Sequence, residues 1–106
     1  MNRVRLRGRL VSDPQFRSLA NGDSLWSFRV VIPRSGPARA LAATDALDCV
    51  AWEGRISRTV QTWREGDEVE VAGALRRRFF RSGAATVSRV EVEAVAGRLI
   101  RRGETS

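Results

Sequence analysis

The residues best suited to chemistry lie in one stretch, Val69 to Arg81, which reads VEVAGALRRRFFR. Its first half places Val69, Val71 and Leu75 on alternating positions, as a half-buried strand does. Its second half is a run of arginines and phenylalanines. Guanidinium groups pair phosphates bidentately and aromatic rings stack on unpaired bases, so an exposed arm of this composition suits single-stranded nucleic acid. An ordinary edge strand, with solvated arginines and covered phenylalanines, fits the stretch equally well, and the rest of the chain must distinguish the two.

The charge balance favours a polyanionic partner. The 106 residues include 19 basic and 12 acidic side chains, which gives a net charge of +7, and every basic residue is arginine. Such a balance favours nucleic acid first and an anionic membrane surface second. No apolar run approaches the roughly 20 residues of a membrane-spanning helix, so we expect no membrane partner. The N-terminus has no apolar signal-peptide region, and the single Cys49 excludes an internal disulfide, which together predict a cytoplasmic protein.

The composition also argues against catalysis. The chain has no histidine, no tyrosine and one cysteine, so a histidine-dependent triad and a Cys/His zinc cluster are both excluded. Its acidic residues are scattered, and no glycine-rich phosphate loop of the Walker type occurs. We therefore expect no catalytic residue, no metal, no cofactor and no small-molecule substrate.

A row of arginines marks the first strand. In Arg3 to Ser12 the apolar residues take one parity, and the other parity is held by Arg3, Arg5, Arg7 and Arg9. Four like charges on one face repel each other, which costs stability unless an anion or a subunit's carboxylates lie against them. Any single arginine here is most simply solvated, whereas the row as a whole predicts a ligand.

Turn signals divide the first half of the chain into short strands. Asp13-Pro14 favours a turn or bulge, and Asn21-Gly22 is typical of a hairpin. The predicted strands are Arg3–Ser12, continued briefly by Gln15–Leu19, then Leu25–Ile32 and Leu47–Trp52, with a long loop from Pro33 to Asp45. The loop has two prolines, a glycine and no clear period, so we expect it to be mobile without a ligand.

The tryptophans divide between packing and binding. Trp26 shares the apolar face of its strand with Phe28, which predicts a core position for both. Trp52 ends its strand on the parity of Asp48, so it is either an exposed platform for a base or a cap on the core.

One helix and two longer strands complete the chain. A helix is predicted over Glu53 to Asp67, because Ile56, Val60 and Trp63 form one apolar stripe and Gly66 supplies a left-handed stop. The stretch Val69–Arg81 follows, then a turn at Ser82-Gly83 and a last strand, Ala85–Val95, with a bulge before Val90.

This order of elements predicts an all-β fold, a five-stranded Greek-key barrel of the OB type with one helix between strands 3 and 4. Residues 1–102 form the single OB-fold domain, and residues 103–106 form a short polar C-terminal tail. Such barrels bind oligonucleotides across one sheet face.

The sequence also resembles the DNA-binding domain of bacterial single-stranded DNA-binding proteins, over nearly the whole chain. The resemblance rests on the order and spacing of five segments: MNRVRLRGRL, DPQFRSLANG, SFRV, TWREGDEVEVAGALR and RRFF. It implies sequence-tolerant binding of single-stranded DNA, protecting it during replication, recombination or repair, and a homodimer or homotetramer. The DNA-binding residues that it implies are Arg3, Arg17, Trp52, Arg76, Arg78 and Phe80, with Trp52 and Phe80 in stacking positions.

The departures from this family leave alternatives open. Ala46 stands where an aromatic platform is usual, the loop Pro33–Asp45 lacks the family's second aromatic, and the acidic tail tip has no counterpart. We expect weaker stacking in consequence, at about 1–3 kcal/mol per lost base. An accessory protein that pairs with a full-length homologue or a replication-restart factor is one alternative, and a single-stranded RNA binder is another.

Overall fold

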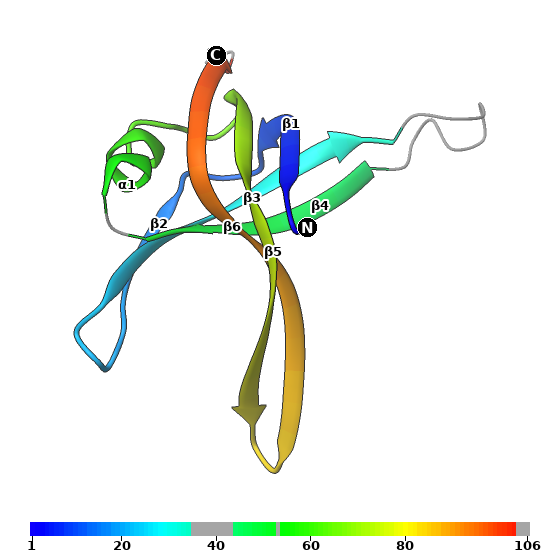
Figure 1. Ribbon diagram of the computed structural model, residues 1–106. Coiled ribbons are helices and arrows are strands. Elements are labelled where there is room, and N and C mark those ends of the chain that lie inside the picture. The colour runs from blue at the N-terminus through cyan, green and yellow to red at the C-terminus, as the bar shows by residue number, and fades with distance from the viewer. Residues whose placement is uncertain (35–43, 53, 104–106) are drawn as a thin grey trace.

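Strands account for nearly all of the regular structure. The computed structural model describes residues 1–34, 44–52 and 54–103. Its elements are β1 (Val4–Leu10), β2 (Gln15–Ser18), β3 (Ser24–Pro33), β4 (Thr44–Ala51), α1 (Arg55–Val60), β5 (Glu68–Ser82) and β6 (Ala85–Arg101) (Figure 1). Most of the predicted loop, residues 35–43, lies outside the described residues. In the described part no helix is long and apolar enough to cross a membrane.

Hydrogen-bond ladders join five strands in a closed circuit. β1 pairs with β5, β5 with β6, β6 with β4 in parallel, and β4 with β3. The circuit closes where β3 pairs with the end of β1, through Arg9 opposite Val31 and Leu10 opposite Val30. β2, the continuation of the first predicted strand, pairs with the same edge of β3 as the end of β1 does, nearer the start of β3. The predicted five-stranded barrel is thus confirmed, and its helix lies between β4 and β5, which are the third and fourth barrel strands in chain order.

The barrel interior is filled by apolar side chains from all five strands and from α1. Trp63 is 1% exposed and meets Phe28 edge to face, with ring centroids 5.6 Å apart. Trp26 is partly buried against the core and contacts the exposed ring of Phe16 on β2. The core positions predicted for Phe28 and Trp63 are therefore confirmed. The buried cluster comprises Leu10, Phe28, Val30, Cys49, Ala51, Ile56, Val60, Trp63, Val69, Val71, Val92 and Ala94.

The helix is shorter than the sequence predicted. It spans Arg55 to Val60 instead of Glu53 to Asp67, although Ile56, Val60 and Trp63 all remain buried. Trp63 N–H donates to the carbonyl of Val60, three residues back, which turns the chain out of the α-helical path. The buried carboxylate of Asp67 then accepts the N–H of Arg64 and fixes this turn. The predicted burial of Ile56, Val60 and Trp63 is confirmed, but a tight turn, and not a longer helix, places Trp63 in the core.

The last strand is longer than predicted and its bulges lie elsewhere. β6 continues past Val95 to Arg101, and its pairing with β5 runs without a break around Val90, so the predicted bulge there is wrong. The register shifts fall instead between Ala72 and Gly73 and between Glu68 and Val69. A Cβ at Gly73 would collide with the backbone carbonyl of Glu93, which explains why glycine stands at the first of these shifts.

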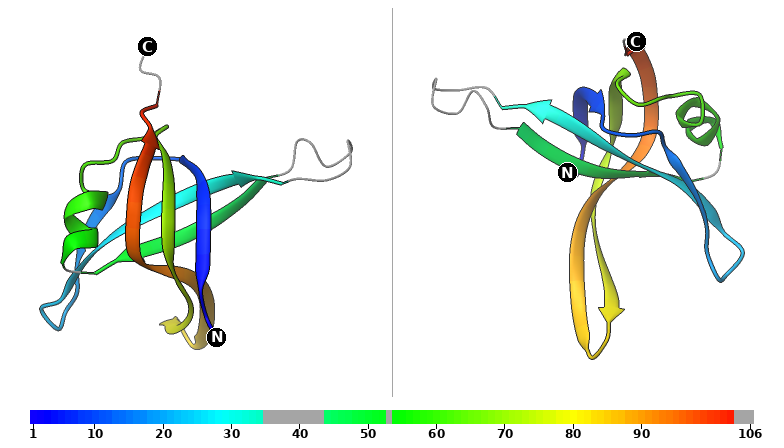
Figure 2. Two further views of the ribbon diagram at one scale, coloured as in Figure 1. Left: turned by 45° about the horizontal axis from the view of Figure 1, so that its top comes forward. Right: turned by 180° about the vertical axis from the view of Figure 1, so that it is seen from behind.

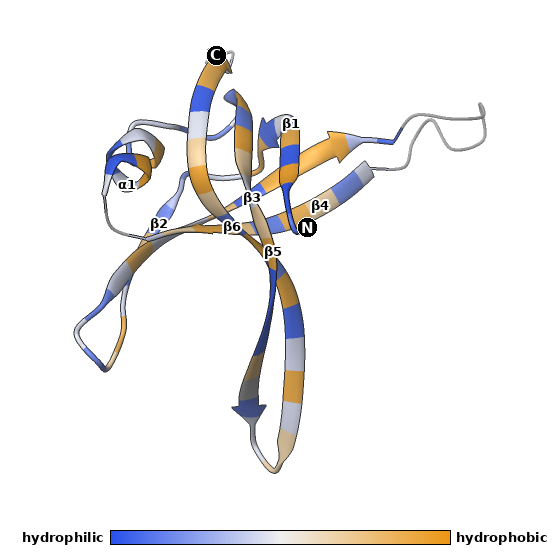
Figure 3. Ribbon diagram, in the orientation of Figure 1, coloured by the Kyte–Doolittle hydropathy of each residue, from blue (hydrophilic) through white to orange (hydrophobic). Residues whose placement is uncertain are grey.

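Beyond the barrel, β5 and β6 continue as a two-stranded arm, residues 76–91 (Figures 1 and 2). The arm ends at the two-residue turn that begins with Gly83, whose φ is +64°. Figure 3 shows hydrophilic and hydrophobic bands along β6 in the arm. Both faces of the arm carry arginines: Arg76, Arg78 and Arg89 lie on one face, and Arg77 and Arg81 lie on the other with the exposed ring of Phe79.

Candidate nucleic-acid interface

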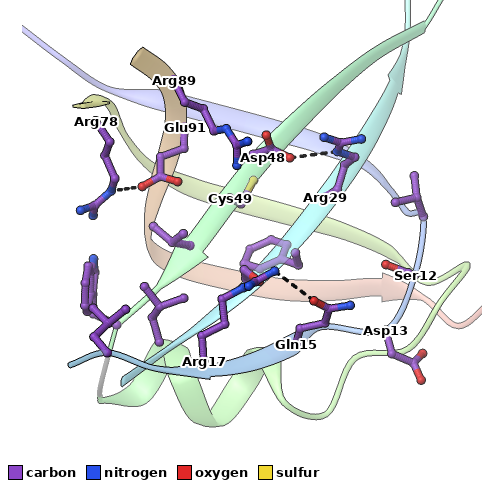
Figure 4. A pocket seen from close by; sticks show the side chains of 17 residues that line it. Ser12, Asp13, Gln15, Arg17, Arg29, Asp48, Cys49, Arg78, Arg89 and Glu91 are labelled. Atoms are coloured by element: carbon purple, nitrogen blue, oxygen red, sulfur yellow. Dashed lines mark hydrogen bonds and ion pairs between the residues drawn. The ribbon is translucent and has the colours of Figure 1, made fainter. Parts of the chain in front are cut away.

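A pocket of about 730 Å³ lies on the outer surface of β3 and β4, between β2 and the arm (Figure 4). Its lining combines apolar side chains with arginines and carboxylates, and it is open to solvent along one side. The lining residues are Val11, Ser12, Asp13, Gln15, Arg17, Leu19, Leu25, Ser27, Phe28, Arg29, Asp48, Cys49, Val50, Trp52, Arg78, Arg89 and Glu91.

The pocket brings together three of the six residues that the sequence singled out. Arg17 reaches it from β2, where its Nε donates to Ser27 Oγ at 3.0 Å and one terminal nitrogen donates to Gln15 Oε1 at 3.1 Å. Trp52 follows the end of β4 and is half-buried. Arg78 reaches it from the arm. Three strands that are distant in sequence therefore place two cations and one indole around the same space.

Arg78 and Trp52 are in direct contact. The Arg78 guanidinium carbon lies 5.2 Å from the centroid of the Trp52 ring, in cation–π geometry. Its Nε donates to Glu91 Oε1, and its Nη2 is 3.9 Å from Glu93, beyond hydrogen-bond distance. The terminal nitrogens of Arg78 can therefore bind an incoming oxyanion while Glu91 holds the guanidinium in place.

The charges that line the pocket nearly balance. Arg29 Nε donates to Asp48 Oδ1 at 2.9 Å across the β3–β4 ladder, and this hydrogen bond and the Asp48 charge raise the pKa of Arg29. The other lining charges are the cations Arg17, Arg78 and Arg89 and the carboxylates Asp13 and Glu91. The lining thus has four arginines and three carboxylates, a net charge of only +1. A polyanion would be attracted here mainly by replacing a carboxylate as the partner of an individual arginine, and less by the net electrostatic field of the pocket.

The other three predicted residues do not line the pocket. Arg76 is on the same face of β5 as Arg78, with its Nε 3.7 Å from Glu93. Phe80 pairs through its backbone with Val87 in the arm, and its side chain lies outside the described part of the structure. Arg3 is exposed immediately before β1. The neighbour of Phe80, Phe79, is 68% exposed on the opposite face of the arm from Arg78.

Sequence reasoning missed several polar residues of the pocket. Arg29 and Asp48 lie opposite each other on β3 and β4, and Arg89 and Glu91 lie on β6 in the arm. The sequence did mark these four residues as exposed, because each lies on the polar side of its alternating strand. Only the register between strands shows that these parities face the same space.

The chain's one thiol lies beneath the pocket, in the barrel core. Cys49 is 1% exposed, and burial, reinforced by the charges of Asp48 and Glu91, raises its pKa to about 12. A thiol with such a pKa is neutral at physiological pH and a poor nucleophile. Among the described residues no three His, Cys, Asp or Glu side chains gather as metal ligands would. The arrangement is suited to stacking a base and pairing a phosphate, which are the two interactions that unpaired nucleic acid offers.

The family model and the curated relatives that match this chain all belong to the single-strand binding proteins. Residues 1–100 match the model of the single-strand binding protein family. The single-stranded DNA-binding protein A of Bacillus subtilis (strain 168) is 29% identical over 103 residues, which cover 90% of this chain and 58% of that protein. A single-stranded DNA-binding protein of Oceanobacillus iheyensis is 30% identical over 81 residues, covering 76% of this chain and 50% of the relative. The chain thus spans about half the length of these relatives.

A solved structure supports the fold. The Plasmodium falciparum SSB complex with single-stranded DNA superposes with a TM-score of 0.76 at 23% sequence identity, covering 95% of this chain and 94% of that one.

Proposed function

The chain belongs to the single-strand binding protein family, and from that membership and the pocket we infer that it binds single-stranded DNA with little sequence preference. One observation carries this inference: Arg78 lies over the ring of Trp52 in a pocket that Arg17 also reaches. The indole offers a surface on which any base can stack, and the two guanidinium groups offer donors to the adjoining phosphates. None of these contacts reads a base edge, so tolerance of sequence follows.

We assign the remaining predicted residues to contacts with the bound DNA beyond the pocket. Arg76 and Phe80 extend the path along the arm, and Arg3 contacts a phosphate near the start of β1. A bound phosphate would compete with Glu93 for Arg76, whose present separation of 3.7 Å makes that ion pair a weak one.

We further propose a homodimer or homotetramer in the cytoplasm, associated with the nucleoid, which protects single-stranded DNA during replication, recombination or repair. The residues Val4 to Gly8 of β1 pair with β5 on one side, and among the described residues they have no ladder partner on the other. An open strand edge of this kind is a ready site for pairing with another chain.

A competition titration tests the ligand class. Single-stranded DNA, RNA of the same sequence and duplex DNA are titrated in turn against the protein, with its mass followed by light scattering. We expect the single-stranded DNA to bind most tightly, with a logarithmic salt slope of about −0.7 per phosphate contacted. Tighter binding of RNA would favour the RNA alternative. Weak binding of all three, together with association with a longer homologue, would favour the accessory role.

A charge-neutral double variant tests the site itself. Arg78→Gln with Glu91→Gln removes one cation and one anion, so the net charge of the protein is unchanged. We expect the salt slope for single-stranded DNA to become shallower by about 0.7, because one phosphate contact is lost. The matched control is Arg34→Gln with Asp45→Asn, which removes an exposed 2.8 Å ion pair outside the pocket, between the residue that follows β3 and Asp45 of β4. Equal slopes in the two double variants would remove Arg78 from the site.

A further inference from the structure

A second charged surface lies on the outer face of the sheet formed by β1, β5 and β6. In the ladder register Glu70 is opposite both Arg7 on β1 and Arg98 on β6. The next row repeats the pattern, since Glu68 is opposite both Arg9 and Arg101. We call this surface the cationic face; its charged residues are Arg5, Arg7, Arg9, Arg98, Arg101, Glu68 and Glu70.

The two carboxylates of the cationic face are covered and fully engaged. Glu68 accepts a hydrogen bond from Arg7 Nε at 2.9 Å, and Glu70 accepts one from Arg98 Nε at 3.2 Å. These hydrogen bonds, with the surrounding arginine charges, lower the pKa of both glutamates. Their side chains are only 18% and 23% exposed. Both therefore remain ionised at neutral pH and neutralise two of the five arginines, which leaves the face with a surplus of three positive charges.

The arginines, in contrast, remain open to solvent. The side chains of Arg7, Arg98 and Arg101 are 54%, 67% and 69% exposed. Arg5 is exposed and makes no hydrogen bond or ion pair with the described residues. Alternate residues of a strand are spaced about 6.7 Å apart, so the arginines of β1 form a regular row of cations.

The cationic face has no aromatic side chain among its described residues. The space between Arg5 and Arg98 is a shallow depression of about 150 Å³ whose other lining residues are Glu70, Ala72, Ala96 and Gly97. Small side chains leave the guanidinium groups as the main features of the surface. A ligand here is recognised by its negative charge and by hydrogen-bond acceptors, which is how a phosphate backbone is bound.

We propose that the cationic face binds the phosphates of single-stranded nucleic acid that extends beyond the pocket. This inference rests on the proposed function. The two surfaces share β5, which runs from Glu68 on the cationic face to Arg78 in the pocket. Figure 2 shows β1, β5 and β6 side by side in the wall that carries this face, with β3 and β4 crossing behind. A second copy stacked face to face would place two positive surfaces against each other, which charge repulsion disfavours.

The test compares a short and a long oligothymidylate on one variant and its control. The short one has about 8 nucleotides and the long one about 32, roughly half and twice the upper site size of one OB fold. The variant is Arg5→Gln with Arg98→Gln. The control is Arg55→Gln with Arg58→Gln on α1, which removes the same charge from two exposed arginines that line neither surface.

We expect the variant to bind the short strand as the wild type does. For the long strand, the salt slope of the variant should be shallower than that of the wild type by about 1.4, which is two phosphate contacts at about 0.7 each. Between about 50 and 200 mM salt, the fold-loss in affinity of the variant should therefore be about seven times smaller than that of the wild type. The control should keep the wild-type slope for both strands. Failure of the wild type to bind the short strand would contradict the proposed function, whereas wild-type slopes that are equal for short and long strands would overturn only the cationic face.

Two further outcomes also overturn this proposal. Equal changes in the variant and the control would mean that total charge, and not this face, sets the slope. A change in the light-scattering mass of the free variant, with its long-strand slope unchanged, would mean that the face is an interface between copies of the chain.

Discussion

The pocket and the cationic face both expose arginines and both include residues of β5, but they differ in what lies between the charges. The pocket has an indole, apolar walls and nearly balanced charges, so it can take up a base as well as a phosphate. The cationic face has an excess of arginine and only small side chains between the charges, so it offers charge alone. The difference teaches that the net charge of +7 is not concentrated where the aromatic side chain is.

The sign of the charges along β5 explains how both surfaces arise. On one face of this strand Glu68 and Glu70 lie in the barrel, and Arg76 and Arg78 lie towards the arm. Each set is matched by opposite charges on neighbouring strands, arginines around the glutamates and glutamates beside the arginines. Cross-strand pairs of opposite sign stabilise one register, so the charge order of β5 also helps to align the sheet.

The largest effect is expected at the junction between the two regions. Gly73→Ala places a methyl group against the backbone of Glu93, which cannot move without disrupting the β5–β6 ladder. We expect a loss of about 1–3 kcal/mol in the free energy of unfolding, and weaker binding of both short and long strands because both surfaces shift. Chemical denaturation and titration check this. Ala74→Ser is the control at the next position, and a stable Gly73→Ala protein with unchanged binding would show that the two surfaces do not depend on this junction.

Removal of the Trp52 ring tests the stacking interaction that the pocket offers and the cationic face does not. Trp52→Ala should weaken binding of short and long strands by about 1–3 kcal/mol, because one base loses its stacking partner, while the salt slope stays unchanged. Fluorescence anisotropy of a labelled oligonucleotide measures both quantities. Phe16→Ala is the control, since it removes an exposed aromatic ring of β2 that does not line the pocket. A change in slope without loss of affinity at fixed salt would assign Trp52 to the positioning of Arg78 instead.

The smallest effect is expected from pH. Arginine hydrogen bonds hold the pKa values of Glu68 and Glu70 below the usual 4.5, and the chain has no histidine. Groups with lowered pKa values stabilise the fold above their unfolded pKa and lose that contribution as the pH falls through the folded value. Affinity for the long strand and the free energy of unfolding should therefore be flat from about pH 8 to about pH 5, and stability should decline only below about pH 4.5. A transition near pH 6 would reveal a carboxylate with a raised pKa on one of the surfaces.

Much of the barrel could be predicted because its strands alternate cleanly. The parity of Leu6 and Leu10 against the arginines of β1 placed the core and the charged row correctly. The Asn21-Gly22 and Ser82-Gly83 signals marked the β2–β3 and β5–β6 hairpins. The predicted helix was too long because a tight turn after Val60 keeps Trp63 buried without α-helical hydrogen bonds. Apolar spacing alone does not distinguish the two conformations.

The site could be predicted only in part, because it depends on register. The family resemblance pointed to Arg17, Trp52 and Arg78, and the local sequence also pointed to the last two. Their convergence with Arg29 and Glu91 follows from how β2, β3, β4 and β6 pair. The cationic face was visible as an arginine row on β1. Its glutamates come from β5, and the register shift near Val69 decides that Arg101 joins them.

The placement of Trp52 has a practical consequence. The chain has three indoles and no tyrosine; Trp63 is sealed in the core and Trp26 packs against it, so Trp52 is the indole that a bound base would reach. Intrinsic emission of the unlabelled protein should therefore be quenched by any strand that occupies the pocket and stay nearly unchanged for one held only on β1, β5 and β6. The protein contains its own optical reporter for distinguishing the two modes of occupancy.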